Sequence, residues 1–301
     1  MYYTEGYSPG TVVTLTAENQ GTNVFAAWTG SVSSLSNQIH VTMNGNKSAI
    51  ALFNNTGDFI LQKTNGQLAV WFMQHTEQVA AAMLNNEVAL GSNWRVAGTG
   101  DFDNNGSKDL LFRGLNGKAA LWLMDGNHRI GSVAIRDGFA LSSLWRLAAV
   151  GDFNSDNSPD LLWQNKTKGK LHIWYMNGTT YDSNATLAYT VGSSWRVVAV
   201  ADLDGNNSSD IIFQHTTGKV AVWLMDGETR TGSIGLRDGL APKPGWHVVG
   251  ARDMDGDGHT DIVFQQDNGR LMVWFFEGTA FNRAELINKV SDPGWYLRAL
   301  K

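Results

Sequence analysis

Cysteine is absent from the 301 residues, which excludes a disulfide framework, a thiolate metal site and a cysteine nucleophile. No apolar run approaches the roughly 18 residues that span a bilayer, so membrane insertion is not expected. Charged residues make up only 17% of the chain and the net charge is −5, which argues against nucleic acid as a partner. The opening segment MYYTEGYSPG has neither the basic region nor the apolar core of a signal peptide.

Tryptophan and glycine are abundant, with 12 and 33 residues, and both recur with a period of roughly 50 residues. The recurring pattern is W-x6-D-x-[DN]-x-[DN]-x3-D, then a short strand-like segment, a glycine turn and a second apolar segment that contains tryptophan. The markers are the first tryptophans Trp94, Trp145, Trp195, Trp246 and Trp295, the second tryptophans Trp71, Trp122, Trp174, Trp223 and Trp274, and the glycines Gly66, Gly117, Gly169, Gly218 and Gly269.

Each copy of the repeat predicts four strands. The third strand is apolar at nearly every position, so it must be covered on both faces. Four-stranded sheets stacked face to face in a ring meet this need, which predicts a β-propeller. A weaker fourth strand follows the pairs Asp125-Gly126, Asn177-Gly178 and Asp226-Gly227, which are typical of type I′ hairpins.

The two ends of the repeat array complement each other. The first copy has a second strand (58–62) and a third strand (68–73) but no inner strand, whereas an isolated inner strand (295–300) follows the last copy. Pairing this strand with the first copy completes five blades and leaves no sheet edge open. We therefore predict an all-β fold in which residues 55–301 form a five-bladed propeller closed by the C-terminal strand.

Residues 1–54 do not follow the repeat and predict a separate small β domain. Strands are expected at 12–17, 25–30, 38–43 and 47–53, with Asn44-Gly45 as a hairpin turn. The junction, 54–57, is so short that the two domains are expected to touch.

Four acidic loops join the predicted inner and second strands, at 101–109, 152–160, 202–210 and 253–261, with Asp or Asn at positions 1, 3, 5 and 9. Carboxylates this crowded repel one another unless a cation neutralises them. Oxygen ligands in a flexible loop favour calcium, and Gly or Asn at position 6 suits the left-handed backbone that wraps an ion. The first copy has no such loop, because the sequence ends at Lys301, one position before the first ligand. Asx-rich polar turns without an ion are the alternative.

About four calcium sites are thus predicted, with position 7 contributing a backbone carbonyl. The candidate ligands are Asp101, Asp103, Asn105, Ser107 and Asp109; Asp152, Asn154, Asp156, Ser158 and Asp160; Asp202, Asp204, Asn206, Ser208 and Asp210; and Asp253, Asp255, Asp257, His259 and Asp261.

These loops, followed by D-[LI]-[LIV]-[FW]-[QR] and LWLM-[DN]-G, resemble the FG-GAP/VCBS repeats of extracellular bacterial proteins and integrin heads over about residues 58–301. The resemblance implies a propeller, calcium in the acidic loops and an extracellular or cell-surface location; Asn157 and Asn207 depart from its usual glycine. Residues 11–53, with GTVVTLTA, AWTGSV and VTMNGNKSAIALF, resemble small bacterial repeat domains related to the internalin B-repeat. The usual first strand of that family is missing, so we expect a piece of a longer protein.

No catalytic motif is recognisable, since the seven histidines lack metal-ligand spacing and no nucleophile elbow or phosphate loop occurs. We predict no enzyme activity. The leading function is recognition of a glycan or cell-surface polymer, as in a lectin or adhesin. The alternative is a structural or accessory domain of a larger secreted enzyme or surface protein.

Two sets of residues at the start of the inner strands are candidates for ligand binding. The tryptophans would form shallow pockets between blades if exposed, or core if buried. The next residue points away from the tryptophan and would form a basic ring at the channel end opposite the acidic loops, or else simple solvated charge. The candidates are Trp94, Trp145, Trp195, Trp246, Trp295, Arg95, Arg146 and Arg196, with His247 and Tyr296 in the remaining positions.

Overall fold

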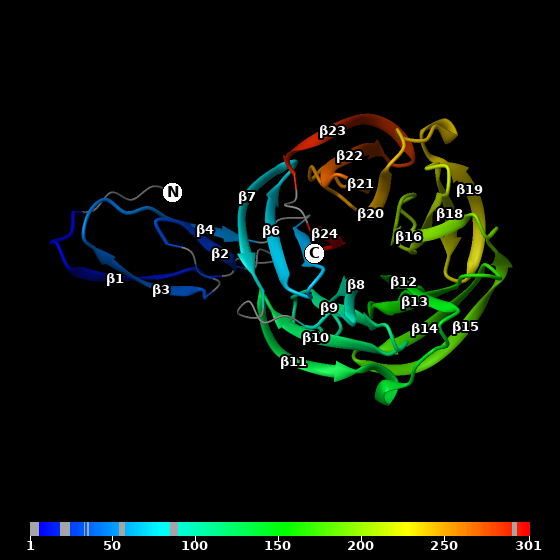
Figure 1. Cartoon of the computed structure of the whole chain (residues 1–301), viewed down its shortest axis with the longest axis horizontal. Coiled ribbons are helices and arrows are strands. Elements are labelled where there is room, and N and C mark those ends of the chain that lie inside the picture. Colours follow the sequence, from blue (N-terminus) through cyan, green and yellow to red (C-terminus); the bar gives the residue numbers. More distant parts are fainter. Residues whose placement is uncertain are drawn as a thin grey trace.

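The computed structural model describes residues 6–18, 25–32, 34, 36–53, 58–84, 90–290 and 294–301. It is an all-β ring of sheets with a small β region projecting from one side, beside β7 (Figure 1). The helices among the described residues are two 3₁₀ turns, η2 (Ile135–Gly138) and η3 (Leu236–Gly239). Within the described segments, no helix has the length and apolar character needed to cross a membrane.

The ring consists of five antiparallel sheets of four strands, each running outward from the central channel. Blade 1 holds β24 (Trp295–Leu300), β5 (Phe59–Lys63), β6 (Leu68–Gln74) and β7 (Glu77–Met83). Blade 2 holds β8 (Trp94–Gly100), β9 (Asp109–Gly114), β10 (Ala119–Asp125) and β11 (His128–Ala134). Blade 3 holds β12 (Trp145–Gly151), β13 (Asp160–Asn165), β14 (Lys170–Asn177) and β15 (Thr180–Thr190). Blade 4 holds β16 (Trp195–Ala201), β17 (Asp210–His215), β18 (Val220–Asp226) and β19 (Thr229–Gly235). Blade 5 holds β20 (Trp246–Arg252), β21 (Asp261–Gln266), β22 (Arg270–Glu277) and β23 (Ala280–Val290).

The C-terminal strand closes the ring. β24 pairs antiparallel with β5, so that Trp295 lies opposite Lys63 and Leu300 lies opposite Phe59. The inner strand of blade 1 therefore comes from the opposite end of the chain from the other three strands. The five-bladed propeller predicted from the repeat is confirmed.

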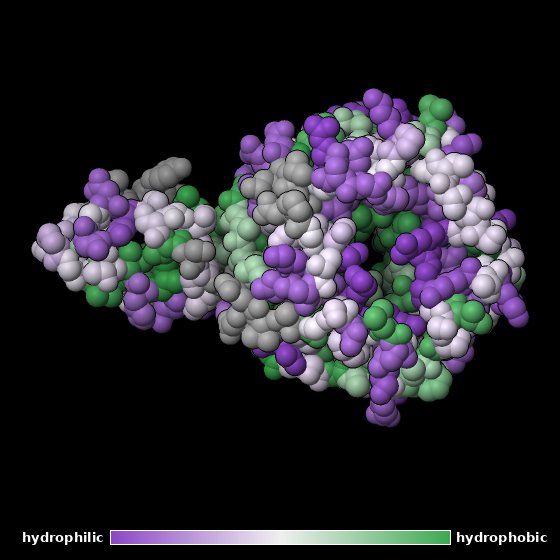
Figure 2. All heavy atoms as spheres, viewed as in Figure 1, coloured by the Kyte–Doolittle hydropathy of each residue, from purple (hydrophilic) through white to green (hydrophobic). Residues whose placement is uncertain are grey.

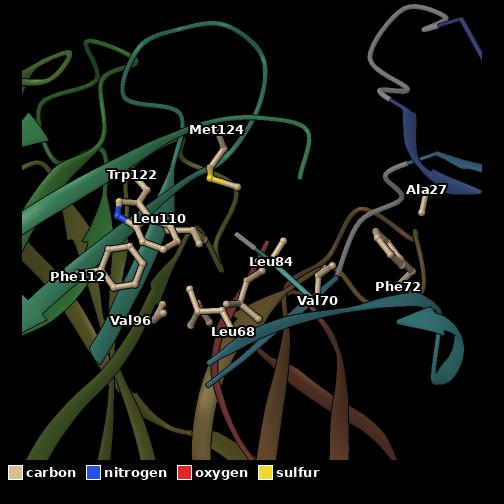
Figure 3. Packing of buried hydrophobic residues seen from close by; sticks show 12 residues of the cluster. Ala27, Leu68, Val70, Phe72, Leu84, Val96, Leu110, Phe112, Trp122 and Met124 are labelled. Carbon is tan, nitrogen blue, oxygen red and sulfur yellow. The ribbon is translucent and has the colours of Figure 1, made fainter. Parts of the chain in front are cut away.

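The core lies between neighbouring blades. Figure 3 shows side chains of blade 1, such as Leu68 and Val70, near Leu110, Phe112 and Trp122 of blade 2. Both faces of the second and third strands are covered, which is why these strands are apolar without alternation. The third-strand tryptophans belong to this core, and all but the half-buried Trp223 are fully buried: Trp71, Trp122, Trp174 and Trp274.

A polar side chain near the end of the second strand ties most blades to the next one. In blade 4, Gln214 Nε2 donates to the Trp246 carbonyl at 2.9 Å and Oε1 accepts from Val248 N at 3.0 Å. Gln62 and Gln164 make the same pair of bonds from blades 1 and 3.

The same position also serves the remaining two blades. Gln265 of blade 5 accepts from Leu297 N at 3.1 Å, so this bond reaches the closing strand β24. In blade 2 the residue is Arg113, whose Nη2 donates to the Trp145 carbonyl at 3.1 Å. The repeat therefore carries a polar link across every boundary between blades.

The hairpins between third and fourth strands correct one prediction. Asp125 pairs with His128, so the two turn residues are Gly126 and Asn127, not Asp125 and Gly126. Gly126 has a φ of 56° and Asn127 has no positive φ. A glycine at the first turn position alone is the type II′ pattern rather than type I′. The equivalent turns begin at Gly178, Gly227 and Gly278.

The N-terminal region contains four strands that pair as two separate ribbons. β1 (Thr11–Thr16) pairs with β3 (Gln38–Met43), and β2 (Phe25–Gly30) pairs with β4 (Ala49–Phe53). The hairpin predicted at Asn44-Gly45 is wrong, because the strands on either side of it bind different partners.

The N-terminal region touches the ring, as its short junction predicted. Ala27 joins the apolar cluster shared by blades 1 and 2, and it is labelled beside Phe72 in Figure 3. The Phe25 carbonyl lies against Gly126, where an added Cβ would approach it to 3.3 Å. Residues 54–57 of the junction lie outside the described residues.

Candidate metal sites and the channel mouth

The last aspartate of each acidic loop anchors the loop to its blade. Asp109 starts the second strand of blade 2 and is fully buried. Its Oδ2 accepts from Phe102 N and its Oδ1 from Met124 N, both at 2.8 Å. One carboxylate thus binds both the loop and the end of the third strand. The same two bonds are made by Asp160, Asp210 and Asp261.

Burial disfavours the charged form of this carboxylate. It raises the pKa of Asp109 and Asp160 to about 6 and that of Asp261 to about 7, and it also raises the pKa of Asp210. The backbone hydrogen bonds oppose this rise, whereas the other loop aspartates add to it. A cation bound beside the group would stabilise its charged form.

The first aspartate of the loop holds the turn. Asp101 Oδ1 accepts from Asn105 N at 3.1 Å, and Oδ2 accepts from Gly106 N at 2.9 Å. Position 6 is left-handed in every loop, as predicted: Gly106 (φ 87°), Asn157 (65°), Asn207 (64°) and Gly258 (87°). Position 4 is left-handed as well, which the sequence analysis missed: Asn104, Ser155, Gly205 and Gly256.

Three of the four loops bring three carboxylates together. In each, one ligand atom from every member lies within 4.8 Å of the others: Asp101, Asp103 and Asp109; Asp202, Asp204 and Asp210; Asp253, Asp255 and Asp261. Groups of carboxylate oxygens suit a hard divalent cation.

The blade 5 group contains an oxygen that lacks a partner. Asp255 Oδ1 is buried and forms no hydrogen bond, while Oδ2 accepts from Arg283 Nη2 at 3.0 Å. A buried carboxylate oxygen without a partner is costly. Because two other carboxylates lie beside it, a cation is the partner that fits this donor set best.

The loop of blade 3 differs from the others. Its position 3 is Asn154, whose Nδ2 donates to Asp156 Oδ2 at 2.9 Å. Asp152, Asp156 and Asp160 do not form such a group within the described part of the chain. In blade 3, an amide that donates a hydrogen bond to Asp156 therefore occupies the position where the other three loops have a carboxylate.

Several predicted ligands at positions 5 and 7 also form hydrogen bonds within the blade, and their role as metal ligands stays a prediction. Asn105 and Asn206 donate through Nδ2 to the carbonyls of Met124 and Met225, each at 2.8 Å. Asp257 Oδ1 accepts from His259 N at 2.8 Å, and Asp257 stands outside the blade 5 group. Ser107 and Ser208 accept through Oγ from the next hairpin turn. The predicted role of the position 7 carbonyls, including those of Ser158 and His259, stays a prediction.

Blade 1 carries a lysine at the corresponding corner. Its buried aspartate, Asp58, accepts from Met73 N at 3.0 Å. Lys301 is buried beside it and donates through Nζ to the Gly126 carbonyl at 2.6 Å and to Asn127 Oδ1 at 2.8 Å. Burial lowers the pKa of Lys301 to about 8, against the attraction of Asp58 and Asp109. A side chain of the protein thus supplies positive charge at this corner.

The repeat itself decides the family. Three overlapping segments, 101–163, 152–213 and 202–264, match the FG-GAP-like repeat and together cover more than half of the chain. The chain belongs to the FG-GAP-like repeat family. Each FG-GAP-like match begins at the first aspartate of an acidic loop and ends in the second strand of the next blade. The acidic loops are therefore part of the repeat that defines the family.

Similarity to individual proteins is weak. No curated protein matches the chain. Among solved structures, AofleA from Arthrobotrys oligospora is 11% identical, with a TM-score of 0.44 over 96% of this chain and 92% of that one. BBS1N, solved in complex with ARL6DN, is 10% identical, with a TM-score of 0.35 over 83% of this chain and 72% of that one. With TM-scores this low, neither likeness supports a statement about this chain.

The tryptophans at the starts of the inner strands are neither free nor fully enclosed. Trp246 is buried, and Trp94, Trp145, Trp195 and Trp295 are half-buried. The ring of Trp195 packs on His215, with centroids 4.8 Å apart. A cavity of about 440 Å³ between blades 3 and 4 is lined by Trp195, Phe213, Trp223, Thr190 and Lys219, among others. This cavity lies beside one of the predicted positions, and ligand binding by these tryptophans stays a prediction.

The residues that follow these tryptophans surround the channel. Arg95 and Arg196 are exposed and Arg146 is half-buried. In blade 5 the equivalent residue, His247, bonds through Nε2 to Asp267 at 2.9 Å. Tyr296 of blade 1 is exposed. Three of the five positions of the predicted ring carry arginine, and ligand binding there stays a prediction.

Proposed function

We propose that this chain is a calcium-binding, non-catalytic recognition module of an extracellular or cell-surface protein. Three carboxylate groups recur at the same place in the repeat, which supports a role shared by the blades rather than a single active site. The observation that carries the calcium assignment is the buried, unpartnered Oδ1 of Asp255 beside two further carboxylates.

Calcium would act on stability through the buried loop anchors. An ion that binds only the folded state at a hundred times its Kd adds about 2.7 kcal/mol per site. It would also favour the charged form of Asp261, whose pKa is raised by burial. Magnesium fits less well, since it demands octahedral geometry and retains its water, whereas calcium accepts flexible carboxylate sets.

The test compares two variants that remove one negative charge each. Asp255→Asn removes a member of the blade 5 group, whereas Asp267→Asn changes an exposed carboxylate bonded to His247. Calorimetric titration of the metal-free full chain should show saturable calcium binding, and calcium should raise the thermal unfolding temperature. Asp255→Asn should bind one equivalent fewer, while Asp267→Asn should match the unchanged protein. A metal-free protein whose unfolding temperature ignores calcium would refute the proposal.

The ligand we propose is a glycan or a cell-surface polymer. The cavity beside Trp195 and Trp223 supports this, because aromatic faces and a few polar groups are what sugar sites commonly offer. A glycan array probed with the full chain, with and without calcium, tests it. Trp195→Ala should abolish any signal that arises in this cavity.

A structural or accessory role within a larger secreted enzyme or surface protein is the second candidate. It is favoured by the burial of the strand-start tryptophans, since none of these five is exposed. If no glycan on the array binds the chain while calcium stabilises it, the result would favour this structural role. We also retain the VCBS and internalin B-repeat resemblances as proposals about the origin of the two regions.

A further inference from the structure

Four arginines lie on consecutive inner strands around the channel. Arg95, Arg146 and Arg196 are each the second residue of their strands, β8, β12 and β16. Arg298 comes from the closing strand β24, which contacts β8 on one side and β20 on the other. Figure 2 shows hydrophilic residues gathered around the opening of the ring, where the inner strands lie in Figure 1.

The guanidinium groups are close enough to repel one another. Burial, followed by repulsion from Arg196, lowers the pKa of Arg146 to about 9. Burial and then Arg95 lower the pKa of Arg298, and Arg196 contributes as well. β24 and β16 are not adjacent in the ring, but both are inner strands beside the central opening (Figure 1), and Arg196 contributes to the lowered pKa of Arg298.

Nothing in the described chain neutralises this charge. None of the four arginines forms an ion pair with a described carboxylate, and no carboxylate is among the groups that act on Arg146, Arg196 or Arg298. The Nε of Arg298 is buried without a hydrogen-bond partner. Blade 5 differs, because its His247 is paired with Asp267.

One guanidinium is held in place and another remains free to bind. Arg146 Nη2 donates to Gln164 Oε1 and to the Val197 carbonyl, which fixes the group between blades 3 and 4. Arg196 has an exposed side chain although protein surrounds much of it, as expected for a group inside a water-filled channel. Buried charges in proteins are normally paired, yet neither the half-buried Arg146 nor the half-buried Arg298 has an anionic partner among the described residues.

We propose that this side of the channel is an oxyanion site formed by Arg95, Arg146 and Arg196, near the ends of the inner strands opposite the acidic loops, and by Arg298, two positions further along its strand. Its ligand is a phosphate or sulfate group, which several planar guanidinium forks bind through charge-assisted hydrogen bonds. The group is either a free ion or a sulfate ester on a polysaccharide. This site does not depend on calcium. The test of oxyanion binding can therefore fail while calcium binding is confirmed, and the reverse.

The experiment titrates the full chain with inorganic phosphate and with sulfate at constant ionic strength, using chloride as the reference. Arg196→Gln and Arg298→Gln remove one channel charge each. Arg270→Gln, on the exposed start of β22, makes the same change of charge elsewhere. Each channel variant should weaken binding about tenfold or more, the loss expected for one charge-assisted hydrogen bond, and Arg270→Gln should bind as the unchanged protein does.

A second readout separates binding from misfolding. Without oxyanions, Arg298→Gln should unfold at the same temperature as the unchanged protein or higher, because it relieves repulsion; phosphate should then stabilise it less. Dextran sulfate against neutral dextran identifies the source: tighter binding of the sulfated polymer than of free sulfate indicates the ester, and the reverse order indicates the free ion. Absence of saturable phosphate and sulfate binding, or an equal loss in Arg270→Gln, would overturn the proposal.

Discussion

The polar links between blades allow a quantitative test of what holds the ring together. Gln214→Met keeps the size of the side chain but removes every hydrogen bond that it makes. The buried Trp246 carbonyl and Val248 N–H then lose the partners that lie at 2.9 and 3.0 Å. The minor bond to the Gly218 carbonyl, at 3.4 Å, is lost as well.

The magnitude follows from the two buried backbone groups. Each unsatisfied group lowers the free energy of unfolding by about 1–3 kcal/mol. The apolar methionine side chain offsets part of this, so we expect the free energy of unfolding to fall by about 3 kcal/mol. In a chain of 301 residues that corresponds to a fall of about 5 °C in the thermal unfolding temperature. The effect should persist in saturating calcium, because no acidic loop is touched.

Thermal unfolding followed by tryptophan fluorescence is the assay, with Gln74→Met as the matched control. Gln74 is exposed at the end of β6, so the same substitution there should shift stability by less than about 0.5 kcal/mol. If Gln214→Met unfolds at no lower temperature than Gln74→Met, the polar links contribute nothing to stability, and apolar packing alone holds adjacent blades together.

Three further outcomes are expected. Gly169→Ala should destabilise the protein by about 3 kcal/mol, because the added Cβ would clash with the Val191 carbonyl. Gly205→Ala should destabilise it clearly less, because Gly205 shares the left-handed φ but has open space around it. Equal unfolding temperatures of the two variants would contradict this. Asn154→Asp should raise the calcium affinity of blade 3 by placing a carboxylate at position 3 beside Asp152 and Asp160, which titration would show as an added or tighter site; unchanged binding would contradict it. In metal-free protein the unfolding temperature should fall between about pH 4 and pH 7, because burial raises the pKa of Asp261 from 3.8 to about 7 and the resulting stability, fully present below pH 3.8, is lost as the pH rises to 7; a rise over that range would contradict the sign.

The ring was predictable because independent markers repeat with one period. The tryptophans, turn glycines and acidic loops each define the blades, and the missing inner strand at one end matches the isolated strand at the other. The left-handed backbone at position 6 followed from residue type, since Gly and Asn tolerate it. Ser155 at position 4 gave no such signal, because serine seldom adopts that conformation.

Where no repeat marks the strands, pairings with distant backbone were not predictable. Asn44-Gly45 has the composition of a hairpin turn, yet β3 and β4 find partners elsewhere, because nothing local encodes which strand lies alongside. The linking glutamines bind carbonyl and N–H groups of the next blade, and backbone groups carry no sequence signature.

The candidate metal sites show the same limit at the level of single ligands. Asn and Asp both offer an oxygen, so the sequence could not distinguish Asn105, which braces the loop, from a ligand. Nor could it show that Asp109 is an anchor buried in the blade as well as a candidate ligand. These roles depend on which groups the fold places within reach of the side chain.

The seam between β24 and β5 has a consequence for how the protein is made. Ribosomal synthesis delivers β5 long before β24, so the growing chain holds one incomplete sheet until β24 emerges. During that interval the inner edge of β5 is an unpaired template for any extended segment nearby. A peptide copying residues 295–300 would therefore compete with the native strand for that edge.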